Sequence, residues 1–170
     1  GVIRRFKIKR LKLISSAGHN SEIDEKFHQL NLVNIANVIY WKDIFEKVKD
    51  INGDIVECGV GRGRSLIIIS AINYLLDKNE GGDRKIYGYD SFEGFPEPTK
   101  EDRSIRNPQE GEWSRSPSGT YKYSEDFTEL VLREAGVLFD DSKPTLTKGF
   151  FCDTLISHPD RPIAILHVDG

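Results

Sequence analysis

The feature that most constrains this sequence is a short apolar run that ends in a cluster of glycines and leads into a helical pattern. Residues 54–60 form a β-branched run of the length expected for a buried strand. Gly59, Gly61 and Gly63 follow at alternate positions, and residues 65–76 are then mostly apolar and helical in character. Because glycine has no Cβ, its backbone can turn tightly and approach a ligand closely. The segment therefore predicts a strand, a glycine-rich turn and a helix packed on a sheet.

The same alternation of strand and helix patterns continues along the chain. Further strands are expected at 85–89, 144–147 and 163–168, with helical segments at 22–49, 123–135 and 154–157. Residues 96–120 are rich in proline, glycine and charge, which predicts a long loop of the kind that often covers a binding site. Strands that alternate with helices favour right-handed βαβ units. The predicted fold class is therefore α/β with a parallel sheet.

The composition is that of an ordinary globular protein. The chain has 170 residues, of which 38% are hydrophobic and 30% charged, and this length can bury a core. We expect a basic arm and helices over residues 1–50 and the sheet domain over 51–170. No apolar run approaches the roughly 20 residues of a membrane span. The first five residues also lack the apolar stretch of a signal peptide. We therefore expect a cytoplasmic location and no membrane partner.

Charge and cysteine content exclude other classes of function. The net charge of −3 gives no reason to expect a nucleic-acid partner. The basic and apolar residues at 3–13 could bind phosphates or lie beside a homo-oligomer contact. Cys58 and Cys152 lack the CxxC spacing of metal and redox sites. Two buried free thiols are favoured over a disulfide between them, given the expected intracellular location.

The spacing of the glycines and the acidic residue before them indicate the kind of ligand. The pattern is GxGxG, whereas dinucleotide-binding turns carry GxGxxG. Glu57 stands two positions before Gly59, where a carboxylate would repel a pyrophosphate and attract a cation. S-adenosylmethionine, with its ammonium and sulfonium groups, is such a ligand. The structural alternative for Glu57 is a salt bridge at the end of the strand.

A second acidic residue follows the second predicted strand. Asp90 comes directly after residues 85–89, where a carboxylate can accept both hydroxyl hydrogens of a ribose. The alternative is that Asp90 only forms a turn. Together with the glycine turn, the ribose role is favoured.

Four blocks of this sequence resemble the macrocin O-methyltransferase family, whose members methylate sugar hydroxyls on macrolides and related natural products. The blocks lie at 53–65, 89–98, 148–155 and 165–170, and the second, which reads Tyr-Asp-Ser-Phe-Glu-Gly-Phe-Pro-Glu-Pro, is the most specific. The resemblance implies a Rossmann-like class I methyltransferase sheet, an S-adenosylmethionine cofactor and a magnesium ion. The cofactor-binding residues that it implies are Glu57, Gly59, Gly61, Gly63, Ser65, Asp90, Ser91, Gly149 and Phe150.

The resemblance also assigns a role to Asp169, at the end of the predicted fourth strand. It implies that Asp169 is a magnesium ligand and a candidate catalytic base. In the family further acidic ligands follow, and here they would lie beyond Gly170. We therefore expect a C-terminally incomplete sheet, weak magnesium binding and self-association of the chain as given. His167 could act as a base or be a hydrogen-bonded core residue.

These observations favour an S-adenosylmethionine- and magnesium-dependent O-methyltransferase acting on a hydroxyl of a sugar or glycosylated natural product. One alternative is a non-catalytic fragment or assembly domain that keeps the cofactor fold. Another is an NAD-dependent oxidoreductase, which the GxGxG spacing and Glu57 disfavour. Phe92, Phe95 and Trp113 could line the acceptor pocket or serve only in packing.

Overall fold

The structure is a computed structural model that describes residues 32–80, 84–102, 104–137 and 143–169. Its elements, in chain order, are α2 (Leu32–Lys47), β1 (Asp54–Cys58), α3 (Arg64–Glu80), β2 (Ile86–Asp90), α4 (Glu125–Glu134), β3 (Thr145–Lys148), α5 (Phe151–Thr154), the 3-10 helix η1 (Leu155–Ser157) and β4 (Ile163–Val168). The predicted basic arm, the first part of the helical segment at 22–49 and Gly170 lie outside the described residues.

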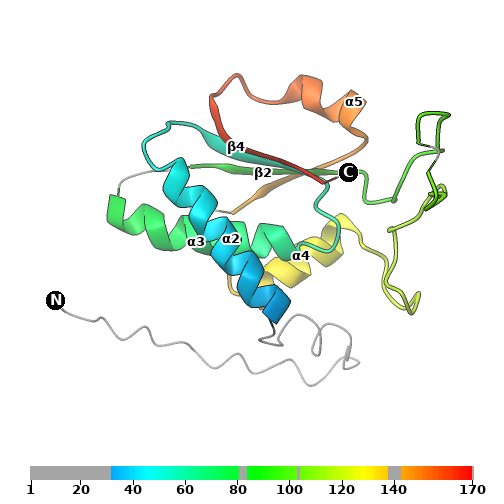
Figure 1. Cartoon of the computed structure of the whole chain (residues 1–170), viewed down its shortest axis with the longest axis horizontal. Coiled ribbons are helices and arrows are strands. Elements are labelled where there is room, and N and C mark those ends of the chain that lie inside the picture. Colours follow the sequence, from blue (N-terminus) through cyan, green and yellow to red (C-terminus); the bar gives the residue numbers. More distant parts are fainter. Residues whose placement is uncertain (1–31, 81–83, 103, 138–142, 170) are drawn as a thin grey trace.

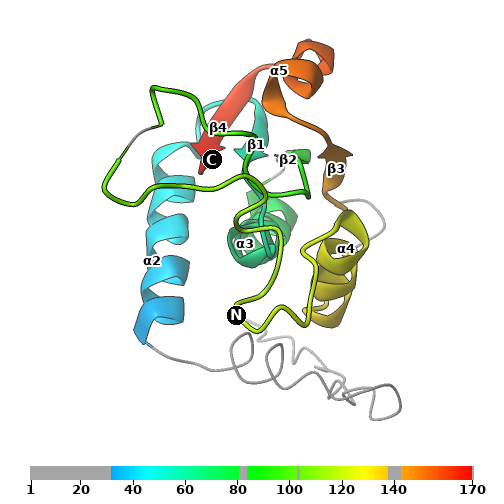
Figure 2. The same cartoon turned by 90° about the vertical axis from the view of Figure 1, so that its right-hand side faces the viewer.

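Within the described residues the strands form one parallel sheet of four strands in the order β3-β2-β1-β4 (Figure 2). β1 lies between β2 and β4, and all of its residues are buried. A strand with neighbours on both sides and cover on both faces is expected to be continuously apolar, and most of β1 is. The predicted α/β fold with a parallel sheet is therefore confirmed.

Helices cover the two faces of the sheet unequally (Figure 1). α2, α3 and α4 lie on one face, and the short α5 lies on the other. The main core fills the first of these layers, where Trp41 and Phe45 of α2 pack with Ile55 of β1 and Leu66 of α3. The helix that precedes the sheet therefore shares its hydrophobic core.

Local sequence signals explain where α4 begins and ends. Ser124 caps its first turn, because the Ser124 hydroxyl accepts a hydrogen bond from Phe127 N (3.2 Å). Glu125 and Asp126 place negative charge at the positive end of the helix. Gly136, with φ of 70°, follows its end. The predicted helix at 123–135 is thus confirmed within two residues at each end.

The loop between α2 and β1 is closed by one arginine. The Arg84 guanidinium donates to the carbonyls of Val48 (2.8 Å), Ile51 (2.6 Å) and Gly53 (2.7 Å). Gly53 has φ of 144°, and a Cβ there would stand 2.7 Å from Ala164 N. Glycine at this position therefore allows the loop to lie directly against β4.

Two details differ from the sequence prediction. Helical structure at 154–157 begins earlier, at Phe151, because α5 precedes η1 without a break. Only one of the two cysteines is buried as predicted: both thiols are free, but Cys152 is exposed on the short α5, while Cys58 lies inside the central strand. A four-residue helix has too little surface to bury every side chain it carries.

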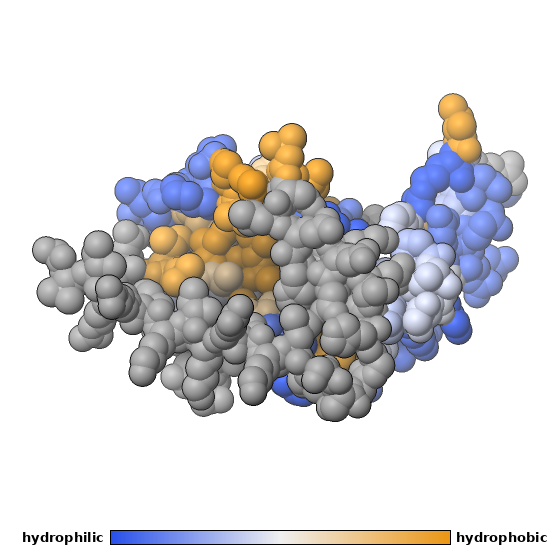
Figure 3. Space-filling view, turned by 90° about the horizontal axis from the view of Figure 1, so that it is seen from below, coloured by the Kyte–Doolittle hydropathy of each residue, from blue (hydrophilic) through white to orange (hydrophobic). Residues whose placement is uncertain are grey.

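α2 exposes several apolar side chains on its outer side. Figure 3 shows hydrophobic side chains on the helical side of the molecule, and the exposed apolar residues of α2 are Leu32, Val33, Ile35, Val38 and Ile39. Only Trp41 and Phe45 of this helix are buried. Among the described helices, none combines the length and apolar character that a membrane crossing requires.

Candidate functional site

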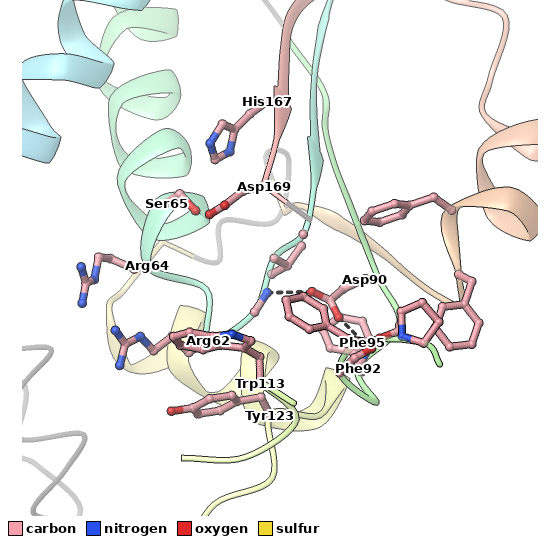
Figure 4. Close-up of a pocket in the computed structure, with 18 of the residues that line it drawn as sticks. Arg62, Arg64, Ser65, Asp90, Phe92, Phe95, Trp113, Tyr123, His167 and Asp169 are labelled. Atoms are coloured by element: carbon pink, nitrogen blue, oxygen red, sulfur yellow. Dashed lines mark hydrogen bonds between the residues drawn. The ribbon is translucent and has the colours of Figure 1, made fainter. Parts of the chain in front are cut away.

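A cavity of about 1130 Å³ opens at the carboxyl ends of the strands. Ligands of parallel α/β sheets bind at this edge. The walls come from the glycine turn after β1, the turn after β2, the end of β4, the first residues of α5 and one side of α2. The long loop between β2 and α4 supplies the remaining wall (Figure 4).

Asp90 joins the ends of the first two strands at the floor of this cavity. Its carboxylate accepts hydrogen bonds from Gly61 N (2.8 Å) and Phe92 N (2.6 Å), as Figure 4 shows. Gly61 has φ of 54°, and an added Cβ would have no atom within 4 Å, so the space above this glycine is open. Asp90 therefore holds the glycine turn in place while its oxygens keep lone pairs for a ligand.

Ser91 and Gly149 shape the turns beside Asp90. The Ser91 hydroxyl donates to Gly94 O (2.7 Å), and Gly149 N donates to Asp90 O (2.9 Å). Gly149 has φ of 143°, and a Cβ there would meet the Thr154 side chain at 2.7 Å. The next residue, Phe150, is 37% exposed and lines the cavity.

Glu57 and His167 form a polar pair on neighbouring strands below the cavity. They are direct partners in the β1–β4 register, and Glu57 Oε1 lies 3.0 Å from His167 Nδ1. The Trp41 ring packs edge-on against the imidazole, with centroids 4.9 Å apart. Figure 4 shows His167, Ser65 and Asp169 close together at this end of the cavity. Glu57 itself is 0% exposed.

Burial governs the protonation of this pair. It raises the pKa of Glu57, and the hydrogen bond from His167 and the nearby Ser65 hydroxyl oppose that shift without cancelling it. The hydrogen bond to Glu57 raises the pKa of His167, against the effect of burial. Glu57 Oε2 has no hydrogen-bond partner within the described part of the chain. A buried carboxylate oxygen without a partner is costly and is typical of a site that meets a ligand.

Asp169 stands exposed at the end of β4. Its backbone N–H donates to Cys58 O (2.8 Å), which fixes its position beside the glycine turn. Residues 32–80, 84–102, 104–137 and 143–169 contain no group of three or more His, Cys, Asp or Glu side chains that could hold a metal ion. Since magnesium needs several convergent oxygens, Asp169 alone does not form its site.

The structure brings most of the sequence-predicted site residues together. Those that line the cavity are Gly59, Gly61, Ser65, Asp90, Ser91, Phe150 and Asp169. Glu57 lies behind the cavity wall, Gly149 forms the turn beneath Phe150, and Gly63 faces α4, where an added Cβ would stand 3.5 Å from the Thr128 side chain. These three residues shape the site without lining it.

The sequence analysis missed the residues that line the cavity from α2, namely Asn37, Tyr40 and Trp41. The sequence of a helix that precedes the first strand does not indicate whether the helix packs beside the carboxyl ends of the strands. Arg62 and Arg64 were also missed, although their place among the glycines could have indicated them. All three aromatic candidates, Phe92, Phe95 and Trp113, line the cavity; Phe92 is 2% exposed and also packs in the core, whereas Trp113 is 59% exposed.

A parallel sheet with helices on both faces defines the chain as an α/β domain, and the glycine turn and Asp90 meet at the edge of the sheet where ligands of such domains bind. The family model described as Macrocin-O-methyltransferase (TylF) matches residues 31–170, and the chain belongs to this family of O-methyltransferases. The predicted resemblance is confirmed.

Individual relatives agree with this assignment. The chain is 29% identical over 124 residues to mycinamicin III 3''-O-methyltransferase of Micromonospora griseorubida, a match that covers 71% of this chain and 45% of that protein. It is 28% identical over 120 residues to 8-demethyl-8-(2,3-dimethoxy-alpha-L-rhamnosyl)-tetracenomycin-C 4'-O-methyltransferase of Streptomyces olivaceus, with coverage of 71% and 43%. The chain thus spans less than half the length of these curated relatives.

A solved structure has the same fold. The crystal structure of a calicheamicin methyltransferase superposes with a TM-score of 0.66 at 21% sequence identity, and the match covers 91% of this chain and 61% of that one. At this identity the likeness establishes the fold. It supports the predicted Rossmann-like methyltransferase sheet.

Proposed function

We propose that this chain forms the S-adenosylmethionine-binding part of an O-methyltransferase that acts on a sugar hydroxyl of a glycosylated natural product. The observation that carries the proposal is the pairing of an open glycine turn with Asp90, next to the buried Glu57. Membership of the macrocin-O-methyltransferase family supports methyl transfer as the reaction. The names of the two relatives support a sugar on a natural product as the acceptor.

The residues at the strand ends fit the parts of the cofactor in order. The open space above Gly61 leaves room for the cofactor beside the glycine turn. Asp90 keeps lone pairs for the two ribose hydroxyls. Glu57 lies behind the cavity wall, and its carboxylate would attract an ammonium group at the methionine end across that wall. Phe150 offers an apolar ring to the adenine. When bound, the cofactor supplies an electrophilic methyl group on its sulfonium.

We infer that the acceptor binds on the other side of the cavity, between α2 and the long loop. Tyr40 of α2 is 56% exposed there, and Trp113 of the loop is 59% exposed. Trp113 has φ of 67°, a left-handed conformation that is rare for an aromatic residue and is typical of functional sites. The Arg106 guanidinium lies 5.7 Å from the Trp113 ring centroid. We infer that these rings hold the face of a sugar.

Asp169 is the carboxylate placed to serve the acceptor hydroxyl. An alcohol is a weak nucleophile at neutral pH, so a nearby base that takes its proton assists the transfer. Asp169 is exposed to the cavity beside Ser65, and its backbone is fixed by Cys58. We therefore assign it the role of proton acceptor or ligand to a cation. The described residues do not complete a magnesium site, so magnesium dependence stays a prediction that further ligands would have to support.

Calorimetry with S-adenosylhomocysteine tests the cofactor site. We expect Asp90→Ala to weaken binding by about 1–3 kcal/mol, the usual range for hydrogen bonds to a charged group. Asp160→Ala is the matched control, because Asp160 is exposed and does not line the cavity. Equal affinities of wild type and Asp90→Ala would remove Asp90 from the site. Tighter binding of NADH than of S-adenosylhomocysteine would overturn the proposed class.

A further inference from the structure

Two arginines stand side by side at one lip of the cavity. Arg62 and Arg64 flank Gly63, both are half-buried, and both line the cavity. Figure 4 shows their side chains extending to the same side of the glycine turn, away from Asp90. Arg64 is also the first residue of α3, so the positive end of the helix dipole adds to the field of the two guanidinium groups.

No carboxylate within the described ranges lies within ion-pair distance of either guanidinium. Other arginines of the chain do have such partners: Arg106 pairs with Glu112 (2.8 Å), and Arg161 pairs with Asp54. The first turn of α3 carries no acidic residue, in contrast to the first turn of α4. The positive charge at this lip is therefore not balanced by the described parts of the protein.

The arrangement is electrostatically unfavourable without a ligand. Burial lowers the pKa of Arg64, and the neighbouring charge of Arg62 lowers it further. Two like charges in a partly desolvated place repel each other more strongly than they would in water. An anion between them would remove the repulsion. Guanidinium groups bind carboxylates and phosphates through paired hydrogen bonds.

We propose that Arg62 and Arg64 form a subsite for an anionic group, a carboxylate or a phosphate, of a small molecule bound in this cavity. This inference rests on the proposed function in one respect: it assumes that the cofactor and the acceptor bind in this cavity. The anion has two possible sources. It is either the carboxylate of the cofactor's methionine part or a phosphate carried by the acceptor, as in a sugar still attached to a nucleoside diphosphate.

Calorimetry on the intact protein separates these sources with three probes. S-adenosylhomocysteine carries the amino-acid carboxylate, 5′-methylthioadenosine keeps the adenosine and thioether without it, and inorganic pyrophosphate represents a phosphate-bearing acceptor. The variant is the double substitution Arg62→Gln with Arg64→Gln. The matched control, Arg115→Gln with Arg133→Gln, removes the same charge from two exposed arginines outside the cavity lining.

If the subsite holds the methionine carboxylate, the double variant loses at least about tenfold in affinity for S-adenosylhomocysteine and keeps its affinity for methylthioadenosine. If it holds an acceptor phosphate, wild type binds pyrophosphate saturably, the variant loses that binding, and S-adenosylhomocysteine is unaffected. Unchanged binding of both anionic probes overturns the proposal, as does an equal loss in the control variant.

A second variant guards against misfolding of the first. Arg62→Lys with Arg64→Lys keeps the charge but loses the paired hydrogen bonds, so it should bind the relevant anion more weakly than wild type. Wild-type affinity in this variant would mean that charge alone acts there, which contradicts an arginine subsite. Failure of the proposed function is seen separately: wild type would then bind neither adenosine probe, while the pyrophosphate measurement would still test the arginine pair.

Discussion

Strand β1 carries a buried carboxylate near each end, and the two have opposite surroundings. Asp54 opens the strand, is 1% exposed, and accepts hydrogen bonds from the Lys85 N–H (3.1 Å) and from Arg161 Nη2 (2.9 Å). Glu57, close to the other end, is 0% exposed and bonded to His167, but its second oxygen has no partner among the described residues. Hydrogen bonds from the protein satisfy both oxygens of the Asp54 carboxylate, whereas among the described residues only one oxygen of Glu57 has a donor.

The pKa values of these two groups shift in opposite directions. Burial by itself would raise the pKa of Asp54, but the hydrogen bonds and charges of Arg161 and Lys85 hold it below its ordinary value. Burial raises the pKa of Glu57, because its partners offset only part of the desolvation. The difference teaches that burial alone does not separate a structural carboxylate from a functional one. The number of lone pairs that the protein itself satisfies does so.

The largest expected effect comes from breaking the structural pair with Arg161→Gln. Removal of this partner leaves the Asp54 carboxylate buried and without its counter-charge. We expect the free energy of unfolding to fall by about 3 kcal/mol, the low end for buried pairs, because water reaches the Arg161 side. The side chain of Arg161 is 45% exposed.

Urea denaturation measures the loss, with the exposed Arg115→Gln as control. Affinity for S-adenosylhomocysteine should stay at the wild-type value, since Asp54 lies at the opposite end of the strand from the cavity. If the Arg161→Gln protein were as stable as wild type but bound the ligand more weakly, Asp54 would belong to the binding site and would not have the structural role that we assign to it.

Glu57→Gln should have the complementary effect. This substitution keeps the shape of the side chain and removes the charge that we propose to face the cofactor's ammonium group. The affinity for S-adenosylhomocysteine should fall by about 1.5–3 kcal/mol, the range for hydrogen bonds to charged groups. Stability should hold or rise, because a costly buried charge is gone. Calorimetry and urea denaturation on the same variant check both outcomes, and a large loss of stability with intact binding would contradict the assignment.

The stability contributed by the groups at the two ends of β1 should depend on pH with opposite sign. The lowered pKa of Asp54 gives stability that is present above its ordinary value of 3.8 and is lost as the pH falls through the folded-state value. The raised pKa of His167 gives stability that is present below 6.5 and is lost as the pH rises through the folded-state value.

Unfolding free energies measured by denaturant from pH 3 to 9, with a chelator present, test this expectation. Arg161→Gln should flatten the acid limb of the profile, whereas His167→Gln should flatten the limb above neutrality. An unchanged acid limb in Arg161→Gln would mean that Asp54 is not the group responsible.

The smallest effect is expected from Ser65→Ala. The Ser65 hydroxyl lowers the pKa of Glu57, so its loss should leave the carboxylate less able to stay charged. Affinity for S-adenosylhomocysteine should fall by about 0.5–1.5 kcal/mol, as for a single neutral hydrogen bond. Calorimetry at neutral and at alkaline pH measures the change, and the loss should shrink at the higher pH. A loss as large as that of Glu57→Gln would mean that Ser65 contacts the ligand directly.

Much of the fold followed from the sequence by itself. Alternating strand and helix patterns, each with its own period and its own stop signals, predicted the parallel sheet and the position of β4 without error. The glycine turn and Asp90 were predictable because βαβ topology brings consecutive strand ends to one edge. These are local signals combined with one general rule of handedness, and they do not depend on how side chains pack.

The tertiary structure alone decided which residues meet. Nothing in the spacing of Glu57 and His167 places them opposite each other, because that pairing depends on the register of β1 against β4, which lie far apart in the chain. The same holds for Trp41, which reaches the site only because α2 packs across the sheet. Whether the oxygens of Asp54 and Glu57 find hydrogen-bond donors likewise depends on residues that are distant in the sequence. A residue's type and its neighbours in sequence fix its local conformation, whereas its burial and its hydrogen-bond partners are set by segments that only folding brings together.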